Sequence, residues 1–169
     1  KSSIVSNLAV TFGMDGAKVL LLDLNLREPA LDRYFKLEGT KGFTDSISGK
    51  IALQDFIVHH PAKGIDILLS GTLTSDPGRL IDSPELREVI STLHKSYDIV
   101  IIDTPPIMRV SDAIVIGRVT DGILYVVESG KTTSPMIEYG LSLIKRSGID
   151  IIGFVLNKTD KKPYSYPIC

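Results

Sequence analysis

The chain has 169 residues, of which 43% are hydrophobic and 23% are charged, and its formal net charge is −1. This balance is typical of one folded domain with a hydrophobic core, excludes a disordered polypeptide, and gives no electrostatic basis for binding nucleic acid. No apolar run approaches the roughly 18–20 residues that cross a bilayer. The single cysteine, Cys169, cannot form an internal disulfide, which is usual in a reducing compartment.

The chain opens on Lys1-Ser2-Ser3, directly before an amphipathic run that predicts a helix. Lys-Ser is the end of the phosphate-binding loop Gly-x-x-x-x-Gly-Lys-Ser/Thr, which leads into a helix in nucleotide-binding proteins. A polar N-terminal cap is the alternative interpretation. We interpret Lys1 as a fragment boundary, so that the strand before such a loop would lie upstream. Because that strand is usually central, we expect a gap or a rearranged edge within the sheet, and low stability of the isolated chain.

Short apolar segments alternate with helical patterns along the rest of the chain. Strands are predicted at Lys18–Asp23, Ile65–Ser70, Asp98–Asp103, Gly122–Glu128 and Asp150–Leu156. Helices are predicted from Ser83-Pro84, Ser111-Asp112 and Ser134-Pro135, with shorter ones at Leu31–Phe35, Phe43–Ser48 and Leu53–Val58 and a solvated helix end at His59-His60. This alternation predicts an α/β fold with a mostly parallel, doubly wound sheet and helices on both faces.

Two of the predicted strands end in a carboxylate, at Asp23 and at Asp103. The carboxyl ends of parallel strands meet at one edge of a sheet, so we expect these side chains to lie close together. Paired carboxylates at such an edge suit a Mg²⁺-nucleotide site, because Mg²⁺ prefers oxygen ligands. For each residue, the alternative is a strand-end side chain that caps a nearby turn.

Five short motifs follow one another along the chain: Asp23-Leu24-Asn25-Leu26-Arg27-Glu28-Pro29, Gly42–Gly49, Tyr97–Pro106, Ser111-Asp112-Ala113 and Val126–Thr133. In this order and spacing they resemble the motifs of the bacterial tyrosine autokinases of capsule and exopolysaccharide export, within the deviant-Walker group of P-loop ATPases. The resemblance runs from Lys1 to about Asn157, which is nearly the whole chain.

The resemblance implies a P-loop kinase domain over residues 1–160 and a tail over residues 161–169 that carries the phosphoacceptors Tyr164 and Tyr166. ATP and Mg²⁺ would be the cofactors, and the γ-phosphoryl group would pass to tyrosines, generally on a neighbouring subunit. The catalytic residues would be Lys1 on the phosphates, Asp23 on the tyrosine hydroxyl and Asp103. The nucleotide would be bound by Lys1, Ser2, Ser3, Arg27 and Asn157, and the metal by Ser2, Asp23 and Asp103.

The same resemblance implies partners and a location. It implies an inner-membrane polysaccharide co-polymerase, fused or separate, together with homo-oligomers that meet at neighbouring nucleotide sites and a tyrosine phosphatase as a further partner. The domain would lie at the cytoplasmic face of the cell membrane. Nucleic acid is not an implied partner.

One departure from the family pattern favours a second reading. Asn25 stands where the motif usually has a second aspartate, which removes a negative charge. A non-kinase, ATP-driven dimerisation switch of the partition and septum-placement type is therefore the main alternative. A regulatory domain without catalysis is another alternative. A last alternative is specificity for GTP, because the guanine-recognition motif Asn-Lys-x-Asp of GTPases is matched by Asn157-Lys158-Thr159-Asp160.

Three of the implied site residues have plainer alternatives. Arg27 could contact phosphate or a neighbouring subunit, or it could pair locally with Glu28 or Asp32 on the surface. Asn157 could lie in a plain polar turn. The two tail tyrosines could be incidental aromatic residues in a disordered end.

Overall fold

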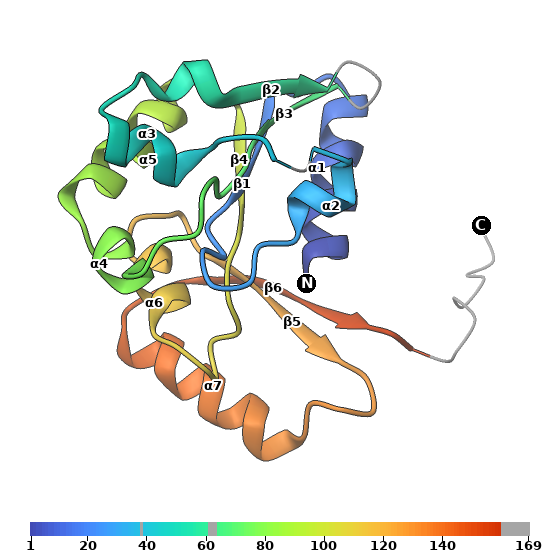
Figure 1. Cartoon of the computed structure of the whole chain (residues 1–169). Helices are drawn as coiled ribbons and strands as arrows, with labels where there is room; N and C mark the ends of the chain where they lie inside the picture. The colour runs from blue at the N-terminus through green and yellow to red at the C-terminus, as the bar shows by residue number, and fades with distance from the viewer. Residues whose placement is uncertain (38, 61–63, 160–169) are drawn as a thin grey trace.

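The computed structural model describes residues 1–37, 39–60 and 64–159 (Figure 1). The elements in chain order are α1 (Ser2–Met14), β1 (Val19–Asp23), α2 (Leu31–Phe35), α3 (Phe43–Gly49), the 3-10 helix η1 (Leu53–Phe56), β2 (Ile57–His60), β3 (Ile65–Leu68), α4 (Pro77–Ile81), α5 (Pro84–Ser96), β4 (Ile99–Asp103), α6 (Asp112–Gly117), β5 (Ile123–Glu128), α7 (Ser134–Arg146) and β6 (Ile151–Asn157). The predicted tail with Tyr164 and Tyr166, and the predicted domain end at residue 160, lie outside the described residues.

The strands form two sheets. In the larger sheet the order is β2-β3-β1-β4, where β1 runs parallel to both of its neighbours and β2 pairs antiparallel with β3. In the smaller sheet β5 and β6 run parallel. This architecture confirms the predicted α/β fold with mostly parallel strands. The ladder does not continue from β4 to β5 within the described ranges, which agrees with the break expected in the sheet.

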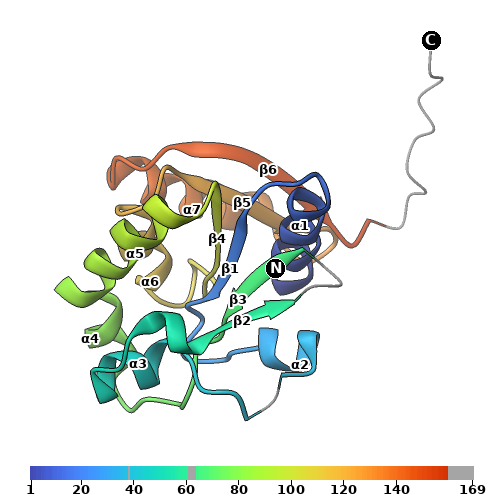
Figure 2. The ribbon, with the colours of Figure 1, turned by 90° about the horizontal axis from the view of Figure 1, so that it is seen from above.

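Helices cover both faces of the larger sheet, as predicted, and Figure 2 shows α1 and α5 on opposite sides of β1. Every residue of β1 is buried, because alternate side chains enter two separate cores. Leu21 packs in the core that contains Ala9 of α1. Leu20 and Leu22 pack in the core that contains Leu86 of α5. The continuous apolar run of β1 is therefore the centre of the domain.

A third core joins the smaller sheet to α7, in the lower part of Figure 1. Ile144 of α7, Tyr125 of β5 and Ile149 are its buried members. None of the helices in the described ranges has the length and apolar content needed to cross a bilayer.

The segment around Leu53 differs from the prediction. The predicted helix Leu53–Val58 is wrong in its last two residues, because only Leu53–Phe56 is helical and β2 begins at Ile57. The predicted solvated helix end at His59 and His60 is wrong as well. His59 faces Asp66 across the antiparallel β2–β3 pair, and its Nδ1 lies 2.6 Å from Asp66 Oδ1.

A short helix, α4, was not predicted. Asp76 caps it by accepting a hydrogen bond from the Arg79 N–H at 3.2 Å, and Pro77 occupies the first turn. The cap and the proline are visible in the sequence, but the helix is too short to show a clear apolar period.

Candidate functional site

The two predicted acidic strand ends lie side by side. Asp23 and Asp103 are partners in the register of the parallel β1–β4 pair, and the Leu24 N–H donates to the Asp103 carbonyl oxygen at 2.9 Å. Both side chains are buried. The prediction that these two carboxylates meet at one edge of the sheet is therefore confirmed.

The N-terminus of α1 meets this edge through Ser2. The Ser2 hydroxyl donates a hydrogen bond to Asp103 Oδ2 at 2.5 Å, although 101 positions separate the two residues. No side chain caps α1, so the alternative of a polar N-terminal cap is wrong. A helix start with an uncapped first turn carries partial positive charge, which favours an anion nearby.

Lys1 and Ser3 lie on either side of Ser2 and are exposed. The structure thus places Lys1 and Ser3 beside the contact between Ser2 and Asp103, and their role in binding a nucleotide stays a prediction.

Asp23 is the most buried of the predicted catalytic groups, with 0% of its surface exposed. Its Oδ1 accepts a hydrogen bond from the Asn25 N–H at 3.0 Å, and its Oδ2 accepts from the N–H groups of Ala30 and Leu31 at 3.4 and 3.3 Å. Burial raises its pKa to about 6, against these backbone hydrogen bonds and with help from the charge of Asp103. In this structure Asp23 therefore holds the loop from Leu24 to Ala30, as its turn-capping alternative predicts.

Asn25 has a structural reason to differ from the aspartate of the family motif. Its side-chain Nδ2 donates to the carbonyl oxygen of Glu28 at 2.5 Å, and its Oδ1 lies 3.4 Å from the Glu28 N–H. An ionised aspartate accepts hydrogen bonds but cannot donate one. The amide therefore makes a contact inside this loop that a carboxylate cannot make.

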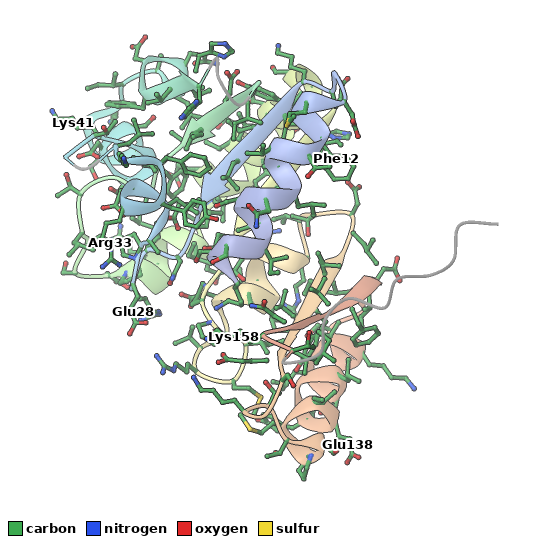
Figure 3. All side chains as sticks on the ribbon, turned by 90° about the vertical axis from the view of Figure 1, so that its right-hand side faces the viewer. Phe12, Glu28, Arg33, Lys41, Glu138 and Lys158 are labelled. Carbon is green, nitrogen blue, oxygen red and sulfur yellow. The ribbon has the colours of Figure 1, made fainter. Side chains whose placement is uncertain are left out.

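Arg27 pairs with Asp112 and not with Glu28 or Asp32, so the alternative of a local surface ion pair is wrong. Its Nε and Nη2 donate to Asp112 Oδ2 and Oδ1 at 2.9 and 3.2 Å, across 85 positions of the chain. Glu28 instead projects outward, as Figure 3 shows, and its Oε1 lies 3.5 Å from Arg109 Nη1. The sequence indicated Asp112 as a helix start and as part of the motif Ser111-Asp112-Ala113, but the pair with Arg27 was missed because nothing local in the sequence links the two residues.

The ends of β5 and β6 carry polar side chains as well. Asn157 is the register partner of Glu128, and its Oδ1 accepts from the Lys158 N–H at 2.9 Å. Lys158, at the end of β6 in Figure 3, donates through Nζ to Glu128 Oε1 at 2.8 Å. The Asn157 side chain thus takes part in the polar turn that was its alternative reading, and base recognition by Asn157 stays a prediction.

Comparison with known proteins adds a family and several relatives. The family model described as an AAA domain matches residues 1–131. The tyrosine-protein kinase YwqD of Bacillus subtilis is 35% identical over 157 residues, which cover 93% of this chain and 66% of that protein. The chain spans only 22 to 23% of several longer curated relatives, which are also described as tyrosine-protein kinases.

Solved structures of a tyrosine kinase domain and of a septum site-determining protein have a similar fold. The kinase domain of the Escherichia coli tyrosine kinase ETK superposes with a TM-score of 0.88 at 29% identity, covering 95% of this chain and 63% of that one. The septum site-determining protein MinD of Pyrococcus horikoshii, solved with Mg-ADP, gives a TM-score of 0.77 at 25% identity, covering 96% of this chain and 66% of that one. Both likenesses extend over nearly all of the present chain.

Proposed function

Because this chain belongs to the AAA domain family, we propose that it binds ATP where β1, β4 and the start of α1 meet and transfers the γ-phosphoryl group to tyrosine. The single observation that carries this proposal is the 2.5 Å hydrogen bond between Ser2 and Asp103. It joins a hydroxyl at a helix start to a buried carboxylate at a strand end. The similarity to bacterial tyrosine-protein kinases supports the choice of acceptor.

The residues at this edge fit a magnesium nucleotide. Ser2 and Asp103 would provide two oxygen ligands to Mg²⁺, and phosphate oxygens and water would complete its shell. The uncapped start of α1, with Ser3 and the Lys1 ammonium, suits the negative charge of the phosphates. Bound Mg²⁺ would balance charge that develops on the phosphates during transfer.

The role of Asp23 depends on the loop that it holds. A pKa of about 6 suits a group that accepts a proton near neutral pH. Both of its oxygens accept loop N–H groups, however, so access to a tyrosine hydroxyl requires movement of the loop from Leu24 to Ala30. We propose that Asp23 orders this loop in the conformation described and acts on the tyrosine hydroxyl only after the loop shifts.

The remaining parts of the proposal rest on the family resemblance. They are phosphorylation of Tyr164 and Tyr166, a polysaccharide co-polymerase as partner, contacts between neighbouring nucleotide sites, and a place at the inner face of the membrane in capsule or exopolysaccharide export. Arg27 is not included as a phosphate ligand, because its guanidinium pairs with Asp112.

The test uses the full-length gene product incubated with labelled ATP and Mg²⁺ and probed for phosphotyrosine. We expect label in the unmodified protein, its loss in Asp103→Asn and Ser2→Ala, and its retention in Thr92→Ala. Thr92 is a matched control because its exposed hydroxyl bonds only to the Glu88 carbonyl within α5. ATP hydrolysis without phosphotyrosine would refute the kinase proposal and support an ATP-driven dimerisation switch.

A further inference from the structure

Two ion pairs of opposite polarity join the loop after β1 to the segment after β4. Arg27 donates two hydrogen bonds to Asp112, at 2.9 and 3.2 Å. Glu28 follows Arg27 in the chain, and its Oε1 lies 3.5 Å from Arg109 Nη1. The loop after β1 follows Asp23 directly, and the segment after β4 follows Asp103 directly. The two pairs therefore connect the chain segments that leave the two acidic strand ends.

The two pairs differ in burial, so they differ in importance. The Asp112 side chain is 4% exposed, and its carboxylate needs a charged partner at that depth. Arg27 meets it in the bidentate geometry that suits a guanidinium and that a lysine cannot reproduce. The side chains of Glu28 and Arg109 are 72% and 68% exposed, and a surface pair of this kind contributes little.

The loop after β1 is held at several points. Asp23 accepts the N–H groups of Asn25, Ala30 and Leu31 and so closes the loop on itself. Arg27 leaves this closed loop and attaches it to the first turn of α6. The hydrogen bond to Asp112 raises the pKa of Arg27, and the charge of Asp76, at the start of α4, acts in the same direction.

We propose that Arg27 is a positioning residue for phosphoryl transfer, which acts through Asp112 to fix the loop after β1 and hence the surroundings of Asp23. This inference rests on the proposed function. It differs from the expectation that Arg27 contacts phosphate, because a guanidinium that already makes a bidentate pair to a buried carboxylate is committed to that carboxylate.

A double-mutant cycle separates the two roles. In the full-length protein, Arg27→Gln and Asp112→Asn should each lower kcat for tyrosine phosphorylation about tenfold and leave the KM for ATP within about twofold. The double variant should be no worse than the poorer single variant, because the neutral pair no longer leaves a buried charge alone. Glu28→Gln, which breaks the exposed pair in the same loop, should keep nearly full activity.

Amide hydrogen exchange gives a readout that is independent of activity. The N–H groups of Ala30 and Leu31 donate to Asp23, and they should exchange faster in both single variants than in the unsubstituted protein. In Glu28→Gln they should exchange at the same rate as in the unsubstituted protein. A large increase of the KM for ATP in Arg27→Gln alone would overturn the positioning role and restore the phosphate contact. Additive losses in the double variant, or unchanged exchange in Arg27→Gln, would overturn it too.

The failure of this inference can be told from the failure of the proposed function. Absence of phosphotyrosine in the unmodified protein refutes the kinase and with it any role in transfer. Normal phosphotyrosine formation in Arg27→Gln refutes only the positioning role.

Discussion

Replacing Asp23 by asparagine should change how the stability of the protein depends on pH. Burial raises the pKa of Asp23 from 3.8 to about 6 in the folded protein, so the folded state holds this proton more tightly than the unfolded chain does. The resulting contribution to the free energy of unfolding is fully present below the unfolded pKa. It is lost as pH rises through about 6, because the buried carboxyl then ionises.

The size of the effect follows from the two pKa values. The interval from 3.8 to about 6, at about 1.4 kcal/mol per pH unit, corresponds to about 3 kcal/mol. The Asp23→Asn variant lacks this titration. The stability of the unmodified protein relative to the variant should therefore fall by about 3 kcal/mol between about pH 4 and pH 7, with no further change above that range.

Urea unfolding at a series of pH values measures this difference. Circular dichroism is a suitable signal, because the chain has no tryptophan for fluorescence. Asp55→Asn is the matched control, since it makes the same exchange at an exposed position in η1. A difference between unmodified protein and Asp23→Asn that stays flat, or that grows with pH, would refute the raised pKa and its origin in burial.

Three further substitutions test contacts described above. Asn25→Asp should destabilise the fold by about 1–3 kcal/mol, because it places a carboxylate against the Glu28 carbonyl, and equal urea midpoints would contradict this. Gly42→Ala should lower the melting temperature by several degrees, because a methyl group there collides with the Leu69 carbonyl, whereas an unchanged value would show that the backbone can adjust. Tyr97→Phe should cost about 1 kcal/mol through loss of its hydrogen bond to a carboxylate of β3, as measured by urea unfolding, and a gain in stability would count against that contact.

The parts of the fold that the sequence predicted well share a physical cause. β1 and β4 are short apolar runs that end at an acidic residue, and a strand of a parallel sheet leaves this signature in a single segment, with apolar residues that are fully buried in β1 and half-buried in β4. Parallel pairing then brings Asp23 and Asp103 to one edge without further information. The start of α5 was equally legible, because Ser83 accepts the Leu86 N–H as its cap.

The parts that were missed depend on partners that are distant in the sequence. β2 is a strand because it pairs with β3, and its residues alone fit a helix as well. Arg27 and Asp112 are 85 positions apart, so their pairing follows from the fold and not from a local motif. In the sequence Asn25 was only a departure from the family motif that removes a negative charge, whereas in the structure its amide donates to the backbone of its own loop.

The break between the two sheets has a consequence for handling this 169-residue polypeptide. Among the described residues, β4 pairs with β1 on one side only, and its apolar side chains are half-buried where those of β1 are fully buried. An edge strand of this kind presents unpaired backbone N–H and C=O groups beside apolar side chains, and strands of other molecules can pair with it. A purified sample of this polypeptide should therefore aggregate and become turbid as it is concentrated. Covering the open edge of β4 should prevent this better than adding surface charge elsewhere.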